Sequence, residues 1–165
     1  MNDKRKKYRL TKTTKIAVNG TQLYQIEAVK DFLNVKKGDL GGYISSEKNL
    51  SQDGDAWVSG DAWVFGNAWV DGNARVSGNV RVSGNAWVYG NARVSGDAWV
   101  FGDALVYGNA RVFGDAWVYG NAMVFGDTWV SGRFNISTNV SVELPRITID
   151  TPAKIKKLKK FLERF

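Results

Sequence analysis

A glycine occupies every sixth position from Gly54 to Gly132, without one slip in the spacing. Between consecutive glycines the sequence reads Asn or Asp, Ala, mostly Trp or Arg, Val, and then Ser or an aromatic residue, and thirteen such repeats follow one another. Six residues are too few for a helical hairpin repeat, but they accommodate a short extended run and a corner. Because glycine and Asn or Asp tolerate the left-handed backbone of corners, the spacing predicts a solenoid of short strands.

Side chains alternate along a strand, so the Ala and Val of each repeat point to one side and the Trp or Arg between them points to the other. The Ala and Val columns are small and uniform, which suits the interior of a narrow coil. If three repeats complete one turn, residues 18 apart stack on one face. Each strand then pairs in parallel with the next coil, about 4.8 Å away.

This repeat, Ala-x-Val-x-Gly-Asn or Asp, resembles the hexapeptide repeat of left-handed parallel β-helix proteins. It is most similar to the YdcK-like group of bacterial and prophage proteins, which also has a leader like Lys37-Gly38-Asp39-Leu40-Gly41-Gly42-Tyr43. The likeness covers roughly residues 8–132. It implies an all-β fold, a single-stranded left-handed parallel β-helix with three hexapeptides per triangular coil, and the handedness follows from the resemblance alone.

We expect three segments: a basic leader and β-hairpin cap at 1–41, the solenoid at 42–144, and a basic amphipathic α-helix at 145–165. Asn19-Gly20 indicates a hairpin between strands at Thr14–Val18 and Thr21–Ala28. The apolar residues expected to pack this cap onto the first coil are Leu23, Tyr24, Ile26, Val29, Phe32 and Leu33.

The first and last coils are expected to be less regular than the others. Ile44 and Leu50 fall in the register of the alanine column, which indicates an imperfect first coil from about Gly42. At the other end, Thr151 as N-cap and Pro152 in the first turn predict the start of the C-terminal helix.

The chain contains no Cys and no His. These absences exclude thiolate nucleophiles, disulfides, imidazole metal ligands and histidine-based acid–base catalysis. Hexapeptide acyltransferases share the resembled fold but use a catalytic histidine and bind acyl-coenzyme A. We therefore expect no enzyme, no cofactor and no metal, with a histidine-free acyltransferase-like activity as an alternative.

The outward column divides into three faces. Face one carries Trp57, Arg75, Arg93, Arg111 and Trp129. Face two carries Trp63, Arg81, Trp99 and Trp117. Face three carries Trp69, Trp87, Leu105 and Met123. The position after Val adds Phe65, Tyr89, Phe101, Tyr107, Phe113, Tyr119 and Phe125.

These aromatic residues have two compatible interpretations. They stack between coils as a ladder that stabilises a thin solenoid, or they form an interface, since large apolar stripes seldom stay exposed on a monomer. The candidate interface residues are Trp69, Trp87, Leu105, Met123, Trp63, Trp99 and Trp117. A surface on which carbohydrate stacks against these rings is a weaker alternative.

The arginines of face one are the second candidate site. Arg75, Arg93 and Arg111 either fan outward and are balanced by corner residues such as Asp97 and Asp115, or bind an anion or an acidic partner. Arg81, between two tryptophans, is expected to make a structural cation–π contact.

Net charge is +7, yet residues 54–132 carry 4 Lys or Arg against 7 Asp or Glu, so both ends are basic. Lys156, Lys157, Lys159 and Lys160 are candidate contacts for nucleic acid or a membrane surface, with a simple capping helix as the alternative.

These observations favour a non-catalytic binding scaffold that acts through protein–protein contacts, as a dimer or trimer through its faces and with an unidentified, acidic protein partner. Nucleic-acid binding through the basic ends is the alternative. No stretch is long and apolar enough for a membrane span, so a cytoplasmic protein is expected. The resemblance to prophage proteins further implies a host-directed or anti-defence role.

Overall fold

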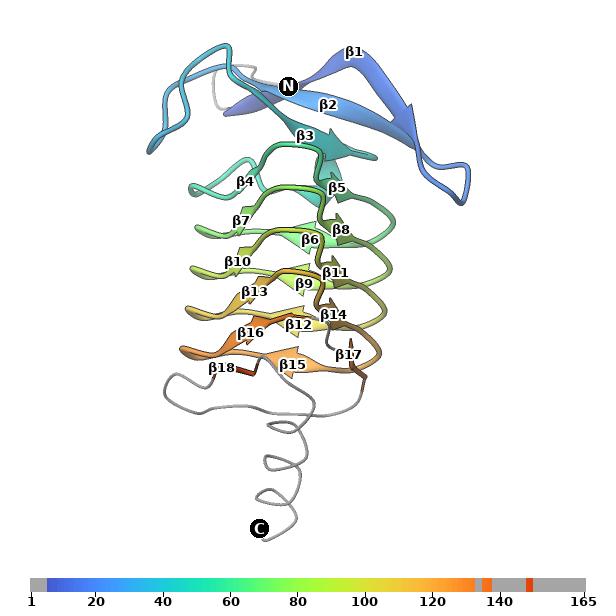
Figure 1. The fold of residues 1–165 in the computed structure, drawn as a ribbon. Helices are drawn as coiled ribbons and strands as arrows, with labels where there is room; N and C mark the ends of the chain where they lie inside the picture. Colours follow the sequence, from blue (N-terminus) through green and yellow to red (C-terminus); the bar gives the residue numbers. More distant parts are fainter. Residues whose placement is uncertain (1–5, 133–134, 138–147, 150–165) are drawn as a thin grey trace, which may run out of the picture.

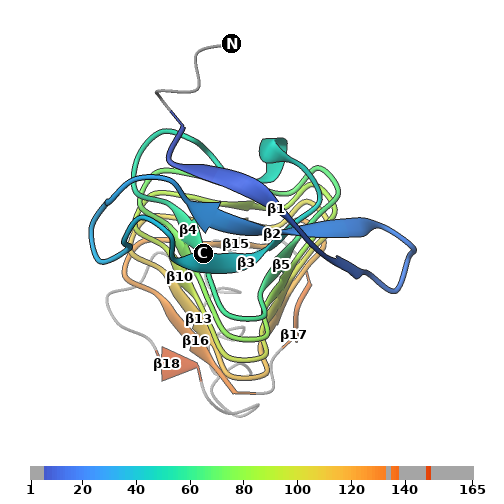
Figure 2. The ribbon, with the colours of Figure 1, turned by 90° about the horizontal axis from the view of Figure 1, so that it is seen from above.

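The computed structural model describes residues 6–132, 135–137 and 148–149. The chain winds into a stack of triangular coils, and strands from successive coils lie one above another on three sides (Figures 1 and 2). In the described part of the chain the only helix is a short 3-10 turn, η2 (Glu47–Asn49). The all-β parallel solenoid expected from the repeat is therefore confirmed.

Each side of the triangle is one sheet. In spatial order, face one consists of β18 (Thr148–Ile149), β16 (Trp129–Ser131), β13 (Arg111–Phe113), β10 (Arg93–Val94), β7 (Arg75–Val76) and β4 (Trp57–Val58). Face two consists of β1 (Tyr8–Ile16), β2 (Gln22–Ala28), β3 (Leu40–Ile44), β5 (Trp63–Val64), β8 (Arg81–Val82), β11 (Trp99–Val100), β14 (Trp117–Val118) and β17 (Asn135–Ile136). Face three consists of β15 (Met123–Val124), β12 (Leu105–Val106), β9 (Trp87–Val88) and β6 (Trp69–Val70).

The register between coils is constant along the regular shaft, where each strand pairs with the strands three repeats before and after it. Arg93 pairs with both Arg75 and Arg111 on face one. Trp99 pairs with Trp117 on face two. The three columns written from the sequence are thus confirmed as three stacked faces.

The interior is filled by the Ala and Val columns, whose residues from Ala56 to Ala122 are fully buried. Two repeats carry a different residue at the alanine position. Val80 is accommodated without exposure, and Thr128 is buried with its hydroxyl donating a hydrogen bond of 2.7 Å to the carbonyl oxygen of Phe125. The buried polar group is therefore satisfied locally.

Glycine is required at the corners for two reasons, both visible at Gly84. Its φ is +69°, and a Cβ there would lie 2.9 Å from the backbone N and O of Gly102 in the next coil. The corner amides also join the ladder between coils, as in the 2.8 Å hydrogen bond from Asn85 N to Gly102 O. The glycine column therefore lets the corners stack as closely as the strands do.

An antiparallel hairpin continues face two beyond the first coil and lies across the end of the solenoid (Figure 2). The hairpin expected at Asn19-Gly20 is confirmed, although β1 begins at Tyr8, earlier than the expected start at Thr14. Gly20 N donates a 2.8 Å hydrogen bond to Ala17 O, and Gly20 takes a φ of 83°. This is a three-residue turn with a left-handed glycine at its end.

Two buried polar residues fasten the cap to the first coil. The Tyr8 hydroxyl donates a 2.6 Å hydrogen bond to Leu50 O. The Lys7 ammonium, 1% exposed, lies 3.2 Å from Asp53 O and 3.2 Å from Gly54 O. Burial, partly offset by nearby aspartates, lowers the pKa of Lys7 to about 8.

The expected register of the first coil is wrong. Ile44 pairs with Val64, and Leu50 forms a bridge with Val70, so both residues occupy the valine position and not the alanine position. The step along the chain from Ile44 to Val64 is longer, by two positions, than the step from Val64 to its next partner, Val82. The corner before Ala56 holds the two extra residues, which restore the register for all later coils.

Beyond Gly132, strand β17 continues face two by pairing with β14. Within the segment 145–165, where a helix was predicted, the structure describes only Thr148–Ile149, which form strand β18 on face one and not a helix. The expected helix start at Thr151 and the residues after it lie outside the described residues. In the part of the chain that the structure describes, no helix has the length and apolar character needed to cross a membrane.

Candidate functional site

The three faces differ in what they present to solvent. On face one, two rungs read Asn-Ala-Arg-Val-Ser, at 73–77 and 91–95, and a third reads Asn-Ala-Arg-Val-Phe, at 109–113. Rungs with Trp in place of Arg frame them, at 55–59 and 127–131. Face one is therefore a polar, cationic wall, whereas faces two and three are largely aromatic.

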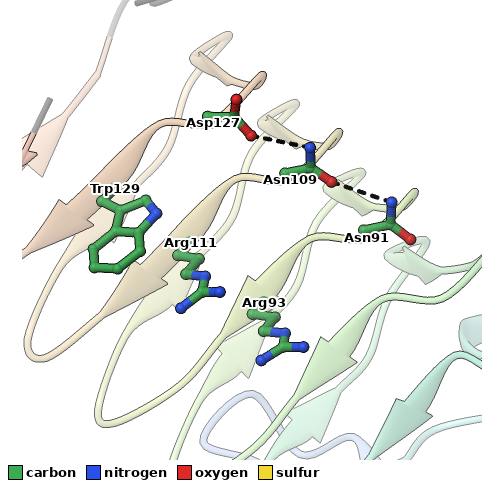
Figure 3. Close-up of a pocket in the computed structure, with 6 residues that line it drawn as sticks. All are labelled: Asn91, Arg93, Asn109, Arg111, Asp127 and Trp129. Atoms are coloured by element: carbon green, nitrogen blue, oxygen red, sulfur yellow. Dashed lines mark hydrogen bonds between the residues drawn. The ribbon is translucent and has the colours of Figure 1, made fainter. Parts of the chain in front are cut away.

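A long open groove of about 1200 Å³ follows face one. The register brings together Arg75, Arg93 and Arg111 along its floor, as the sequence predicted. Figure 3 shows Arg93 and Arg111 extending to the same side of neighbouring strands, with Trp129 beside them. Ser59, Ser77 and Ser95 line the groove from the position after each valine.

Few described groups neutralise or hydrogen-bond the guanidinium groups of these three arginines. Arg75 donates a 2.8 Å hydrogen bond to Asn34 Oδ1, and the guanidinium of Arg111 lies 4.7 Å from the ring centroid of Trp129. The side chain of Arg93 is exposed and makes no hydrogen bond or ion pair with another described residue. Partial burial lowers the pKa of Arg75. The negative charge of Asp55 raises this pKa, and the positive charge of Arg93 lowers it further.

The expectation that corner aspartates balance these arginines is wrong for Asp97. Asp97 and Asp115 both lie at corners that precede strands of face two, β11 and β14. Asp97 accepts a 2.8 Å hydrogen bond from Asn79 and acts on Arg81 of face two. None of the ion pairs between described residues involves an arginine of face one.

A ladder of asparagines forms one rim of the groove. Asn73 Nδ2 donates to Asn91 Oδ1 at 3.0 Å. Figure 3 shows the rest of the ladder, in which Asn91 donates to Asn109 at 3.1 Å and Asn109 donates to Asp127 at 3.0 Å. Each of these three asparagine amides has two N–H donors and uses one of them in the ladder.

The loop between β2 and β3 closes the upper end of the groove. Phe32 packs edge-on against Trp57 with ring centroids 5.4 Å apart, which places Asn34 against Arg75. Leu33 was expected to pack onto the first coil, but it lies exposed at the loop tip with a left-handed φ of 43°. Sequence reasoning missed this part of the site, because only the fold shows which face the loop reaches.

Face three is the most continuous aromatic wall. Trp69 and Trp87 are 38% and 46% exposed and meet edge to face at 5.6 Å. A stack of Tyr89, Tyr107 and Phe125 runs beside them, with ring centroids 4.9 and 5.0 Å apart. The other two predicted members of this face, Leu105 and Met123, are half-buried below the tryptophans.

Face two divides into a covered and an open part. Arg81 lies 3.8 Å over the ring of Trp63 and donates hydrogen bonds to backbone carbonyls, so its predicted structural role is confirmed. The hairpin residues Ala17 and Leu23 cluster against Trp63. In the open part Trp99 and Trp117 stack at 5.2 Å and are 43% and 40% exposed, with a second stack of Phe101 on Tyr119.

A family model for the YdcK β-solenoid repeat matches residues 74–90, 86–102, 104–120 and 116–132. These residues of the shaft are YdcK-type β-solenoid repeats. The matched repeats carry Arg75, Arg93 and Arg111 of face one and the paired tryptophans of face two. No curated protein matches the chain.

The YdcK-type repeat explains the scaffold, whereas function depends on the outward residues that the scaffold displays. The interface candidates are divided between two walls, since Trp69, Trp87, Leu105 and Met123 share face three and Trp63, Trp99 and Trp117 share face two. The candidate contacts Lys156, Lys157, Lys159 and Lys160 lie outside the described residues. Among the residues that the structure describes, no cluster of three or more His, Cys, Asp or Glu could hold a metal ion.

Proposed function

We propose that this YdcK-type solenoid is a non-catalytic binding scaffold that associates with itself through face three. The observation that carries the proposal is the exposure of Trp69 and Trp87 beside the stack of Tyr89, Tyr107 and Phe125. Tryptophan and tyrosine are favoured anchors of protein interfaces, because they bury a large apolar area and keep one polar group.

Charge also favours face three as the contact between copies. No charged residue occurs among its four outward strand residues, and Asp71 is the one acidic residue in the hollow of about 230 Å³ beside Trp69 and Trp87. Two copies of this face therefore bring few like charges together, with Asp71 of each copy at the contact. On face one the same arrangement would bring two rows of arginines together.

Light scattering at micromolar concentration tests the self-association. The expected molar mass is a multiple of the 18.3 kDa of one chain. The double variant Trp69→Gln, Trp87→Gln should have the mass of one chain at the same concentration, while its circular dichroism stays that of the wild type.

The matched control is Trp99→Gln, Trp117→Gln on face two, because it removes a tryptophan pair of similar exposure. We expect this control to retain the wild-type molar mass. A wild-type chain of 18.3 kDa contradicts self-association, and a control that dissociates as well contradicts the choice of face three.

A host-directed, inhibitory role, which the resemblance to prophage proteins implies, is one use of such a scaffold. The exposed tryptophans and the cationic groove provide the surfaces for it. Affinity capture from a bacterial lysate tests this role. A host protein that is held by the wild type and lost on Arg93→Glu, or on the double variant Trp99→Gln, Trp117→Gln, supports it. Equal recovery with the wild type and both of these variants contradicts it.

A further inference from the structure

Positively charged side chains are regularly spaced along the groove of face one, and other residues limit the groove at both ends. Arg75, Arg93 and Arg111 stand on consecutive parallel strands, and the acidic residues that line the groove, Asp55 and Asp127, lie at its corners. Three like charges on neighbouring strands repel one another when nothing negative separates them. The groove is therefore complementary to a ligand that carries a row of negative charges.

The spacing of the arginines indicates what kind of ligand this is. Two steps between paired strands place Arg75 and Arg111 about 9.6 Å apart along the solenoid axis. Carboxylates at positions i, i+4 and i+7 of an α-helix lie on one side and span about 10.5 Å along its axis. Three carboxylates on one side of an extended peptide, at positions i, i+2 and i+4, span about 13 Å. The helix fits the row within about 1 Å, a difference that arginine side chains absorb.

Apolar groups lie near both ends of the row. Leu33 is exposed at the end formed by the loop between β2 and β3. Phe113 and Trp129 line the other end and contact each other edge-on at 6.3 Å. Apolar residues one turn before and one turn after the carboxylates of a helix would contact these groups.

We propose that the groove of face one binds an acidic α-helix of a partner protein, aligned with the solenoid axis, its carboxylates on Arg75, Arg93 and Arg111. The inference rests on the proposed function as a binding scaffold, and it names the class of partner. Guanidinium groups pair with carboxylates through two parallel hydrogen bonds, and the asparagine rim adds N–H donors.

Single-stranded nucleic acid is the competing ligand, because phosphates also pair with arginine. Proteins that bind single strands combine a basic groove with aromatic rings on which successive bases stack. On face one the positions beside Arg75 and Arg93 are Asn and Ser, and aromatic residues line only the end at Phe113 and Trp129. The groove thus has the charges for a nucleic-acid backbone but no stacking platform along its length.

Two fluorescent peptides of about 20 residues, long enough to form helix in water, test the proposal by anisotropy. In one, glutamates recur at i, i+4 and i+7 on a single face. The other has the same composition, with its glutamates distributed around the helix. We expect the full-length protein to bind the aligned peptide at least tenfold more tightly than the scrambled one.

Arg93→Glu should weaken binding of the aligned peptide at least tenfold. Lys12→Glu on strand β1 is the matched control, since it makes the same change in net charge at an exposed residue that does not line the groove. We expect its affinity to stay within twofold of the wild type. Thermal melts of both variants check that the fold is retained.

Three results would overturn the proposal. The two peptides could bind equally well, the Lys12→Glu control could lose as much affinity as Arg93→Glu, or an oligothymidylate of about 15 nucleotides could displace the aligned peptide and itself depend on Arg93. Light scattering on the wild-type protein, compared with its peptide binding, separates this proposal from self-association. A wild-type oligomer that binds neither peptide contradicts only the groove, and a monomer that binds the aligned peptide contradicts only face three.

Discussion

The hydroxyl of Tyr8 donates a 2.6 Å hydrogen bond to the carbonyl oxygen of Leu50. This contact joins the first described strand to the first coil and lies entirely within the core. Tyr8→Phe keeps the ring but leaves a buried carbonyl with one partner fewer, so the free energy of unfolding should fall by about 1–2 kcal/mol. Urea unfolding measures the loss. Tyr24→Phe, at a half-buried tyrosine of the same cap, should change stability by less than about 0.5 kcal/mol.

Lys7 predicts a pH dependence of stability. Its amine, with a pKa of about 8 in the folded protein, loses its proton there long before it does in the unfolded chain, where the pKa is about 10.4. Between these values the unfolded state binds more protons, so stability rises with pH, by about 2 kcal/mol from pH 8 to pH 10. Burial raises the pKa of Tyr8. Above pH 10 this tyrosine therefore loses its proton more readily in the unfolded chain, and its contribution makes stability fall as the pH rises. Lys7→Met should flatten the rise; an unchanged profile would contradict the assignment.

The corner glycines predict a difference between two alanine substitutions. Gly84 and Gly20 both have positive φ, but an added Cβ meets the next coil only at Gly84. Gly20→Ala should cost about 1–2 kcal/mol for the left-handed backbone alone. Gly84→Ala should cost clearly more, because the coils must also move apart. Equal losses in thermal unfolding would show that the close approach of the corners contributes nothing.

The asparagine ladder has a direction, since Asn109 donates to Asp127 and a carboxylate only accepts. Asn109→Asp places two carboxylates side by side and should destabilise the protein by up to about 1 kcal/mol at low ionic strength. The loss should shrink in high salt. Asp127→Asn keeps an acceptor at the end of the ladder and should cost nothing measurable. Guanidinium chloride adds salt, so the comparison requires urea.

Much of the fold could be predicted because one period governs it. The glycine spacing, with three repeats to a coil, is enough to place Trp99 on Trp117 and Arg93 between its two neighbours. The first coil could not be placed in the same way. Ile44 and Leu50 keep the period in the sequence, but two extra residues in the corner before Ala56 move them to the valine position.

The candidate site was predictable only in part. The row formed by Arg75, Arg93 and Arg111 follows from the register, whereas the groove depends on contacts that cross from the cap to face one. Phe32 against Trp57 and Asn34 against Arg75 join residues from different parts of the chain, and no periodicity marks such pairs. Asp97 was assigned to the wrong face for a related reason, because a corner residue can turn toward either of two walls.

The constant register between coils also bears on how the chain acquires its structure. Each strand of the regular shaft pairs with the strand three repeats earlier, so every step of assembly closes a short loop. The cap and the first coil leave the ribosome before the rest and present a finished edge. Every later coil can add to that edge as soon as its residues emerge, so the molecule can be built in the order in which it is translated.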